Sequence, residues 1–271
     1  MTRRRFHAPP DAFTHTDDVP SVTLASDEAR HLRDVLRLRA GDEAFVFDGE
    51  GNEYRCTVAD AGHGRARGGD VATLAIEERV APPHAESPLR LTLALALLKN
   101  EKFDLVVQKA TELGVSRIVP VMTKRGDVRW RDAGDAEKRR GRSKRLALEA
   151  AKQSGRACVP AIDAPATLSA VLSDQTAAGA DCMRVMFTER AGHSLTESLN
   201  GWPARTTSAT ASVTASVTAL VGPEGGWEDE EIAQARDAGW LVVTLGGRTL
   251  RAETAAVTAV VLLQHLGGDL R

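Results

Sequence analysis

Residues Ala219–Gly226 read Ala-Leu-Val-Gly-Pro-Glu-Gly-Gly, and residues Leu241–Gly247 read Leu-Val-Val-Thr-Leu-Gly-Gly. Each stretch is a short apolar run typical of a strand, and each enters a turn rich in glycine. A segment of helical character follows in both cases, Glu228–Ala238 after the first turn and Glu253–Leu266 after the second. Two successive strand–turn–helix units predict an α/β domain whose parallel sheet places a ligand crevice at the carboxyl ends of its strands.

The segment before these units extends the same pattern. Leu89–Leu98 is a dense apolar run, as expected of a strand that is buried on both faces. Phe103–Leu113 predicts a helix ended by Gly114, and Ile118–Val121 predicts the next strand. These elements form a βαβ unit, and a basic helix over about Lys138–Ser154 follows.

The N-terminal part of the chain shows short strands around one helix. Glu28–Leu38 has helical spacing of apolar residues, and Arg30, Arg33 and Arg37 then fall three and four apart. Residues at this spacing share a face of a helix, so a basic face is expected.

A hairpin and a linker complete the N-terminal part. Ala44–Phe47 and Glu53–Val58 flank a run of turn residues and predict a β-hairpin. Ala81–Pro83 has the composition of a linker. We therefore expect a small strand-rich domain over residues 1–80 and a larger α/β domain over residues 81–271.

Composition places the chain among ordinary globular proteins. A length of 271 residues favours two domains, and neither a membrane-spanning run nor a signal peptide is found, so a cytoplasmic location is expected. The three cysteines, Cys56, Cys158 and Cys182, form no metal-binding spacing, and no metal is expected.

The net charge of −2 conceals a basic block. Lys124–Arg156 holds twelve lysines and arginines against five aspartates and glutamates. Such a block is typical of a face that binds a polyanion, and equally of a solvated helix.

Charge also narrows the class of ligand that the glycine turns could hold. Four consecutive acidic residues, Glu228–Glu231, begin the helix after the first turn, and they would repel a polyphosphate. A ligand with a cationic centre, such as a sulfonium, tolerates carboxylates better. From spacing alone, a tight turn with an acidic helix cap is an equally good interpretation.

Several segments resemble one family, the RsmE family of 16S ribosomal RNA uridine-N3 methyltransferases in the SPOUT superfamily. The segments that carry the resemblance occur in the family's order and span nearly the whole chain: His31–Leu38, Val46–Gly49, Phe103–Val115, Ala150–Arg156, Leu220–Gly226 and Leu245–Ala255. The chain departs from the family at Glu228, where a serine helix cap is frequent, at Trp227, where phenylalanine is common, and in the inserted tract Thr206–Ser216.

The resemblance implies a PUA-like β-barrel that binds RNA, followed by a SPOUT-type α/β domain with a C-terminal trefoil knot. It further implies a homodimer, S-adenosylmethionine as methyl donor, and 16S ribosomal RNA or the small ribosomal subunit as substrate. The cofactor-binding residues that it implies are Leu220, Gly222, Glu224, Gly225, Gly226, Leu245, Gly246, Leu250, Arg251 and Thr254.

Methylation of uracil N3 requires removal of a proton or stabilisation of the resulting anion. The hypothesis is that Arg251 stabilises negative charge on the base, while Glu253 or Glu224 positions or accepts the proton. Ion pairing that merely braces the knot is the alternative role for Arg251 and Glu253.

The expected phosphate contacts are cationic residues from both domains. They are Arg3, Arg4, Arg5, Arg30, Arg33, Arg37, Lys124, Arg125, Arg139, Arg140 and Arg142. Two rival functions remain open at this point, a SPOUT tRNA ribose 2′-O-methyltransferase without this barrel, and a ribosome-assembly factor that binds rRNA without catalysis.

Overall fold

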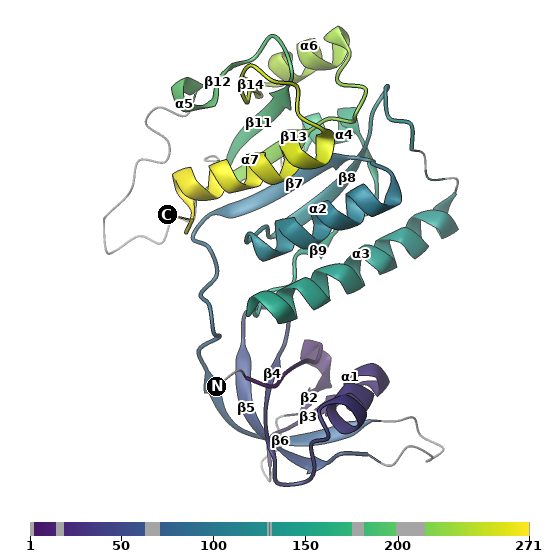
Figure 1. Ribbon diagram of the computed structural model, residues 1–271, viewed down its shortest axis with the longest axis vertical. Coiled ribbons are helices and arrows are strands. Elements are labelled where there is room, and N and C mark those ends of the chain that lie inside the picture. Colours follow the sequence, from purple (N-terminus) through teal and green to yellow (C-terminus); the bar gives the residue numbers. More distant parts are fainter. Residues whose placement is uncertain are drawn as a thin grey trace. The chain divides into compact units, whose positions relative to one another are not determined.

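The computed structural model describes residues 3–14, 19–62, 71–128, 130, 132–174, 182–198 and 215–270. The chain divides into two compact units, Met1–Glu86 with Ala151–Val159, and Ser87–Ala150 with Pro160–Arg271 (Figure 1). Sequence order alone did not indicate that residues 151–159 return to the first unit. Most of the inserted tract Thr206–Ser216 lies outside the described residues.

The first unit is a six-stranded sheet that is antiparallel except for the pairing of its first strand. The strand order across the sheet is β1 (Arg5–His7), β4 (Glu43–Phe47), β5 (Glu53–Asp60), β6 (Ala72–Val80), β3 (Ser21–Leu24) and β2 (Phe13–Thr14). The predicted hairpin is confirmed, because β4 and β5 pair antiparallel with Phe47 opposite Glu53.

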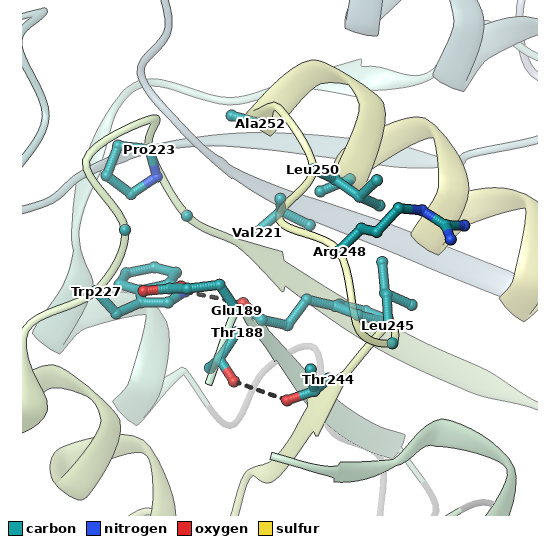
Figure 2. A pocket seen from close by; sticks show the side chains of 15 residues that line it. Thr188, Glu189, Val221, Pro223, Trp227, Thr244, Leu245, Arg248, Leu250 and Ala252 are labelled. Atoms are coloured by element: carbon teal, nitrogen blue, oxygen red, sulfur yellow. Dashed lines mark hydrogen bonds between the residues drawn. The ribbon is translucent and has the colours of Figure 1, made fainter. Parts of the chain in front are cut away.

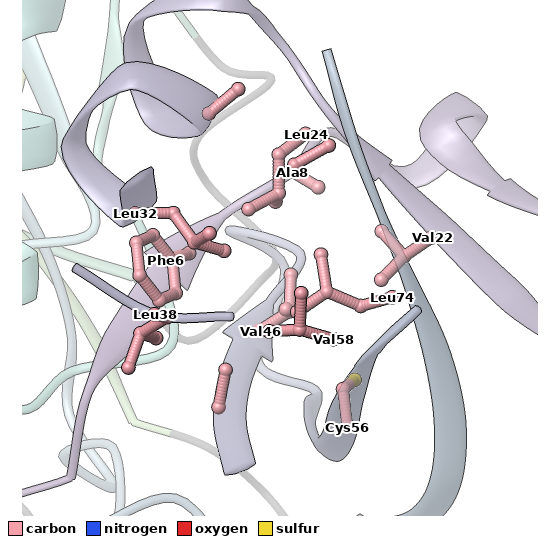
Figure 3. Packing of buried hydrophobic residues seen from close by; sticks show 13 residues of the cluster. Phe6, Ala8, Val22, Leu24, Leu32, Leu38, Val46, Cys56, Val58 and Leu74 are labelled. Atoms are coloured by element: carbon pink, nitrogen blue, oxygen red, sulfur yellow. The ribbon is translucent and has the colours of Figure 1, made fainter. Parts of the chain in front are cut away.

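Alternating side chains of this sheet enclose a hydrophobic core. Val46, Val58 and Leu74 come from three neighbouring strands, and they point inward toward Leu24 and Leu32 (Figure 3). Successive side chains of a strand point to opposite faces, and this period of two buries one face of β3, of β4 and of the first half of β6. A short 3₁₀ turn (Pro10–Ala12) connects β1 to β2.

The predicted helix over Glu28–Leu38 is wrong in its extent and its winding. The chain forms α1 (Ser26–Arg30), continues as a π-helical turn (His31–Val35), and leaves the helix at Leu36. Arg37 follows with a φ of 54°, in the left-handed region. The expected common face of three arginines is therefore absent, because the wider π turn shifts the helical period and Arg37 lies beyond the helix.

The second unit is a parallel sheet of eight strands. The strand order is β10 (Ala166–Thr167), β8 (Arg117–Met122), β7 (Arg90–Ala96), β13 (Ser216–Val221), β11 (Cys182–Thr188), β14 (Leu241–Thr244) and β12 (His193–Ser194), with β9 (Ala161–Ile162) also paired to β8. The predicted βαβ unit is confirmed, since β7 and β8 pair in parallel on either side of α2 (Asn100–Glu112) in the sequence.

Helices cover both faces of this sheet. On one face α7 (Ala252–Gly267) packs on β7 and β13 and contacts α2 (Figure 1). On the other face α4 (Leu168–Ser173) and α6 (Asp229–Asp237) contribute to a core with Leu220, Met186 and Val242. The helix α3 (Ala133–Ser154) lies beside α2, and the short α5 (Leu195–Ser198) follows β12. A sheet buried on both faces explains why its strands are nearly continuous apolar runs.

Candidate functional site

A pocket of about 530 Å³ opens where three neighbouring strands of the second unit end. The order β13, β11, β14 places the loops after Val221, Thr188 and Thr244 side by side. The lining residues are Phe187, Thr188, Glu189, Val221, Gly222, Pro223, Gly226, Trp227, Thr244, Leu245, Gly246, Arg248, Leu250, Ala252 and Ala255. The pocket thus occupies the carboxyl edge of the sheet, where a ligand crevice was predicted.

The first glycine turn approaches an indole ring closely. A Cβ atom added to Gly222 would lie 2.7 Å from the ring of Trp227, so only glycine fits there. Trp227 is 1% exposed, and its indole N–H donates to the carbonyl oxygen of Phe187 at 2.9 Å. The ring is therefore fixed from both sides, and it holds the β13 loop against the end of β11.

The same turn also packs against a carboxylate. Gly226 has a φ of 69°, and a Cβ atom on it would overlap the carboxylate of Glu189. Arg190 binds that carboxylate at 2.6 Å and also donates to the carbonyl oxygen of Trp227 at 2.8 Å. Glu189 thus presents negative charge to the pocket from a braced position.

The remaining wall is mainly apolar. Figure 2 shows Trp227 and Pro223 on the left of the pocket and Leu250, Leu245 and Arg248 on the right. The hydroxyls of Thr188 and Thr244 lie 3.5 Å apart at its base (Figure 2). An apolar wall with a few fixed polar groups is typical of a site for a small organic ligand.

The structure brings half of the predicted cofactor-binding residues to this pocket. Gly222, Gly226, Leu245, Gly246 and Leu250 line it. The other five do not: Leu220 is buried in the core, Glu224 and Gly225 line a neighbouring recess, and Arg251 and Thr254 are exposed at the start of α7.

The three predicted catalytic residues gather around one lysine. The Lys102 ammonium donates to the carboxylate of Glu224 and lies 3.7 Å from Glu253 Oε1. The hydrogen bond from Lys102 holds the pKa of Glu224 below its usual value, and nearby Lys99 and Arg251 act in the same direction. The Oε2 atom of Glu253 is buried and has no hydrogen-bond partner among the described residues.

The acidic first turn of α6 is neutralised by cations. Glu228 binds Arg125 at 2.7 Å, Asp229 binds Arg190 at 2.8 Å, and Glu230 binds Lys124. None of the four acidic residues lines the pocket. Contrary to the expectation from sequence, this turn therefore carries little uncompensated negative charge that could repel a polyphosphate in the pocket.

The unusual cap at Glu228 is accommodated locally. Glu228 is the N-cap residue of α6, and its backbone N–H donates to the buried carboxylate of Glu231 at 2.9 Å. The same carboxylate accepts the backbone N–H of Lys124 at 3.0 Å. The Glu228 side chain accepts the backbone N–H of Glu231, as a serine cap would, so the two residues form a capping box, and Glu231 also joins α6 to the loop after β8.

The predicted RNA contacts of the first unit have different environments. Arg4 and Arg37 are exposed, and Arg30 pairs with Asp27 on the surface. Arg33 pairs with its neighbour Asp34, and Arg3 pairs with Glu53 while its guanidinium lies over the ring of Phe45.

The structure contradicts the prediction that Arg5 contacts RNA. Its side chain is only 7% exposed, and it binds the fully buried carboxylate of Glu53 at 2.9 Å. It also donates to the carbonyl oxygen of Arg156 at 2.9 Å. Because its hydrogen bonds are made inside the first unit, the Arg5 guanidinium stabilises that unit and cannot reach a phosphate.

The predicted RNA contacts of the second unit all have acidic partners. Lys124 and Arg125 pair with α6 as described, and Arg142 pairs with Asp104 at 2.7 Å. Arg139 and Arg140 pair within their own helix, with Asp135 and Glu137. Arg142 stays 61% exposed, so its pairing leaves it accessible to a phosphate.

Sequence reasoning missed the β11 contribution to the pocket, namely Phe187, Thr188 and Glu189, and also Arg248 and the adjoining Ala252 and Ala255. A usable signal was present, because Val185–Thr188 is an apolar run followed by charged residues, as at the end of a buried strand. Its place between β13 and β14 could not be inferred from sequence order.

In the part of the chain that the structure describes, every helix is too short or too polar to span a lipid bilayer. No group of three or more histidine, cysteine, aspartate or glutamate side chains among the described residues is arranged to hold a metal ion.

Comparison with known proteins identifies both units. Residues 85–264 match the family model described as an RNA methyltransferase domain, and residues 24–68 match that of an RNA methyltransferase PUA domain. The ribosomal RNA small subunit methyltransferase E of Synechocystis is 32% identical, and the alignment covers 91% of this chain and 73% of the relative. The enzyme of the same name from Mycobacterium bovis is 31% identical, with 91% and 88% covered.

Solved structures agree along the full length. The chain is similar to ribosomal RNA small subunit methyltransferase E from Neisseria gonorrhoeae bound to S-adenosylmethionine, with a TM-score of 0.79, 29% identity and full coverage of both chains. A putative methyltransferase from Legionella pneumophila in complex with the same cofactor gives a TM-score of 0.80 and 27% identity, again with full coverage of both chains.

Proposed function

The chain belongs to the family of RNA methyltransferases that includes ribosomal RNA small subunit methyltransferase E, and we propose that it methylates N3 of a uridine in 16S ribosomal RNA with S-adenosylmethionine. The observation that carries this proposal is the pocket formed by the two glycine turns at the carboxyl edge of the sheet. The match to a PUA domain argues against the rival that lacks the barrel. The well-formed pocket argues against a binding protein without catalysis.

The lining of the pocket suits the chemistry of S-adenosylmethionine. Leu245 and Leu250 offer apolar surface to an adenine ring, and the Glu189 carboxylate favours a cationic sulfonium. Side chains at Gly222 and Gly226 would displace Trp227 and Glu189, so both positions require glycine.

When bound, S-adenosylmethionine supplies an electrophilic methyl group. The protein must hold the base in line with it and manage the N3 proton. We assign anion stabilisation to Arg251 and handling of the proton to Glu224 or Glu253. This assignment is supported by their shared neighbour Lys102, which joins the first glycine turn to the start of α7.

The proposed RNA grip uses the exposed cations of both units. It retains Arg3, Arg4, Arg30, Arg33, Arg37, Lys124, Arg125, Arg139, Arg140 and Arg142, and it omits the buried Arg5. In this proposal residues 1–80 form the RNA-binding domain and residues 81–271 the catalytic domain. A knot in the C-terminal segment stays a prediction of the resemblance.

A homodimer and a cytoplasmic location complete the proposal. Leu105 on α2 and Val261 and Leu266 on α7 are exposed apolar side chains on two helices that contact each other. Such surface favours burial against a second copy, and sedimentation of the purified protein would reveal a single-chain mass if this is wrong. A ribosomal RNA substrate favours the cytoplasm.

The test compares rRNA methylation with donor binding in the wild type and Arg251→Ala. We expect the turnover of Arg251→Ala to fall about 100-fold or more, since a donor of charge stabilisation is lost from the transition state. Calorimetry should show little change in affinity for S-adenosylmethionine, because Arg251 does not line the pocket. Mass spectrometry of 16S rRNA from cells with and without the gene identifies the product.

Arg90→Ala is the matched control for this test. Arg90 is exposed at the amino end of β7, opposite the edge that holds the pocket, so wild-type turnover is expected. Unchanged turnover in Arg251→Ala would remove Arg251 from the mechanism. Wild-type protein that neither binds the donor nor methylates rRNA would refute the proposed function itself.

A further inference from the structure

A second recess adjoins the pocket along the same edge of the sheet. It has a volume of about 250 Å³ and lies beyond the ends of β7, β8 and β13. Its lining consists of Leu97, Leu98, Lys99, Arg125, Asp127, Val128, Pro223, Glu224 and Gly225. Pro223 lines both cavities, so only one turn of chain separates them.

We propose that this recess receives the target uracil base and that Glu224 reads its N3–H group. The inference rests on the proposed function and specifies the substrate subsite of that same site. A base held here stands next to the pocket for the methyl donor, as transfer requires. The recess suits one unstacked base, because N3 is hidden in a duplex and the base must be splayed out of it.

The polar lining matches the pairing edge of uracil. That edge presents an acceptor, a donor and an acceptor, namely O4, N3–H and O2. A carboxylate that accepts from N3–H and cations that donate to O2 and O4 are complementary to this edge, and Glu224, Lys99 and Arg125 line the recess together with a second carboxylate, Asp127. Cytosine presents an acceptor at N3 and a donor at N4, so the same groups reject it.

The rest of the recess is already built. Leu97 and Leu98 are 3% and 4% exposed and provide an apolar surface for the base. The guanidinium of Arg125 is held by Glu228 at 2.7 Å and by the carbonyl oxygen of Gly225 at 3.2 Å. Lys102 fixes Glu224 from outside the recess. Preorganised groups of this kind lose little entropy when the base enters.

The proton step balances with Glu224 and solvent water. The N3–H bond breaks, its proton passes by way of a carboxylate oxygen of Glu224 to solvent water, and its electron pair stays on the base as an anion shared by N3, O2 and O4. Because Lys102 keeps the pKa of Glu224 low, the carboxylate relays the proton and does not retain it. Lys99 and Arg125 offset the negative charge of the base from inside the recess, and Arg251, to which we assign the same role, adds to this compensation from the start of α7. Because the proton and the incoming methyl group occupy the same in-plane direction at N3, the proton must leave first.

The experiment compares two RNAs that differ at one nucleotide. A short 16S rRNA fragment carries either uridine or cytidine at the methylated position, and fluorescence anisotropy gives its affinity for the full-length protein without turnover. The wild type is expected to prefer uridine about tenfold or more, as one hydrogen bond to a charged group provides. In Glu224→Gln, whose amide can face either base, the preference should fall below about twofold.

Catalysis and donor binding give the second and third readouts. The kcat of Glu224→Gln should fall about 100-fold, in the range of general acid–base contributions. Its affinity for S-adenosylmethionine should stay within about twofold, because Glu224 does not line the donor pocket. Glu224→Asp, which keeps a carboxylate, should retain a preference for uridine. Lys99→Met should weaken binding of the uridine RNA.

Glu112→Gln is the matched control, since it also breaks a lysine–glutamate pair on α2 but lies outside the recess. It should behave as wild type in all three measurements. Glu224→Gln with wild-type uridine preference and wild-type kcat would overturn the subsite while leaving the methyltransferase function intact. Wild-type protein that fails to methylate rRNA would instead overturn the proposed function.

Discussion

At the scale of single residues, the shape of the site depends on positions where only glycine, which has no side chain, can fit. Gly222 faces the indole of Trp227 so closely that an added Cβ atom would lie 2.7 Å from the ring. The ring cannot retreat, because it is 1% exposed and hydrogen-bonded to Phe187. The glycine turn and the tryptophan therefore form one unit that shapes the pocket wall.

Gly222→Ala should lower both stability and affinity for S-adenosylmethionine. Overpacking of this kind costs about 1–3 kcal/mol, and the displaced turn should weaken donor binding about tenfold or more. Thermal unfolding and calorimetry measure the two effects. Gly247→Ala is the control, since a Cβ atom there meets nothing within 4 Å and Gly247 does not line the pocket. Equal behaviour of the two variants would contradict the role given to the Trp227 contact.

Substitution of two neighbouring arginines near the N-terminus should distinguish an arginine that stabilises the first unit from one that binds RNA. Arg5→Ala leaves the fully buried Glu53 with Arg3 as its remaining partner, and we expect a loss of about 3 kcal/mol in unfolding free energy. Arg4→Ala removes an exposed side chain, so its stability should match the wild type while its RNA affinity falls. Urea denaturation followed by circular dichroism measures the first effect and anisotropy the second. If Arg5→Ala were as stable as Arg4→Ala, the buried ion pair would not hold the first unit together.

At the scale of elements, local pattern predicted what local chemistry determines. The β4–β5 hairpin, the β7–α2–β8 unit and the strands before both glycine turns follow from apolar periodicity and turn residues. The prediction of a regular helix over Glu28–Leu38 was wrong because a π-helical turn has no distinctive residue pattern that would reveal it in the sequence. Sequence thus predicted element types well and one helical winding poorly.

The candidate site shows the same division between local and distant information. The strand–turn pattern predicted a ligand crevice, and the family resemblance named Gly222, Gly226 and Gly246 within it; all three line the pocket. Glu189 was missed because β11 lies between β13 and β14 in the sheet, and this strand order cannot be inferred from the sequence of the connecting loops. The contacts of Lys102 are equally invisible in the sequence, since its partners Glu224 and Glu253 lie far along the chain. What the sequence lacked was the register between distant strands.

At the scale of the whole molecule, many of the described cations are paired with carboxylates, and the unpaired ones mark where a polyanion could bind. The net charge is only −2, and most arginines of the basic block pair with nearby carboxylates. Lys138, Arg142 and Arg145 on α3 are exposed and spaced four and three apart, so they share one face. Among the described residues Lys138 and Arg145 have no ion pair, and this face is the strongest candidate on α3 for a grip on phosphates.

Replacement of Lys138, Arg142 and Arg145 together by glutamine should reduce the salt dependence of RNA binding. Each phosphate contact contributes roughly 0.7 to 0.9 to the slope of log affinity against log salt, so three lost contacts should lower the slope by about 2. Anisotropy titrations between low and physiological salt measure it. Arg55→Gln, whose side chain already contacts Glu43, Glu77 and Glu78, is the control for lost charge and should keep the wild-type slope. A slope unchanged in the triple variant would place the RNA elsewhere, because counterions are released only where cations meet phosphates.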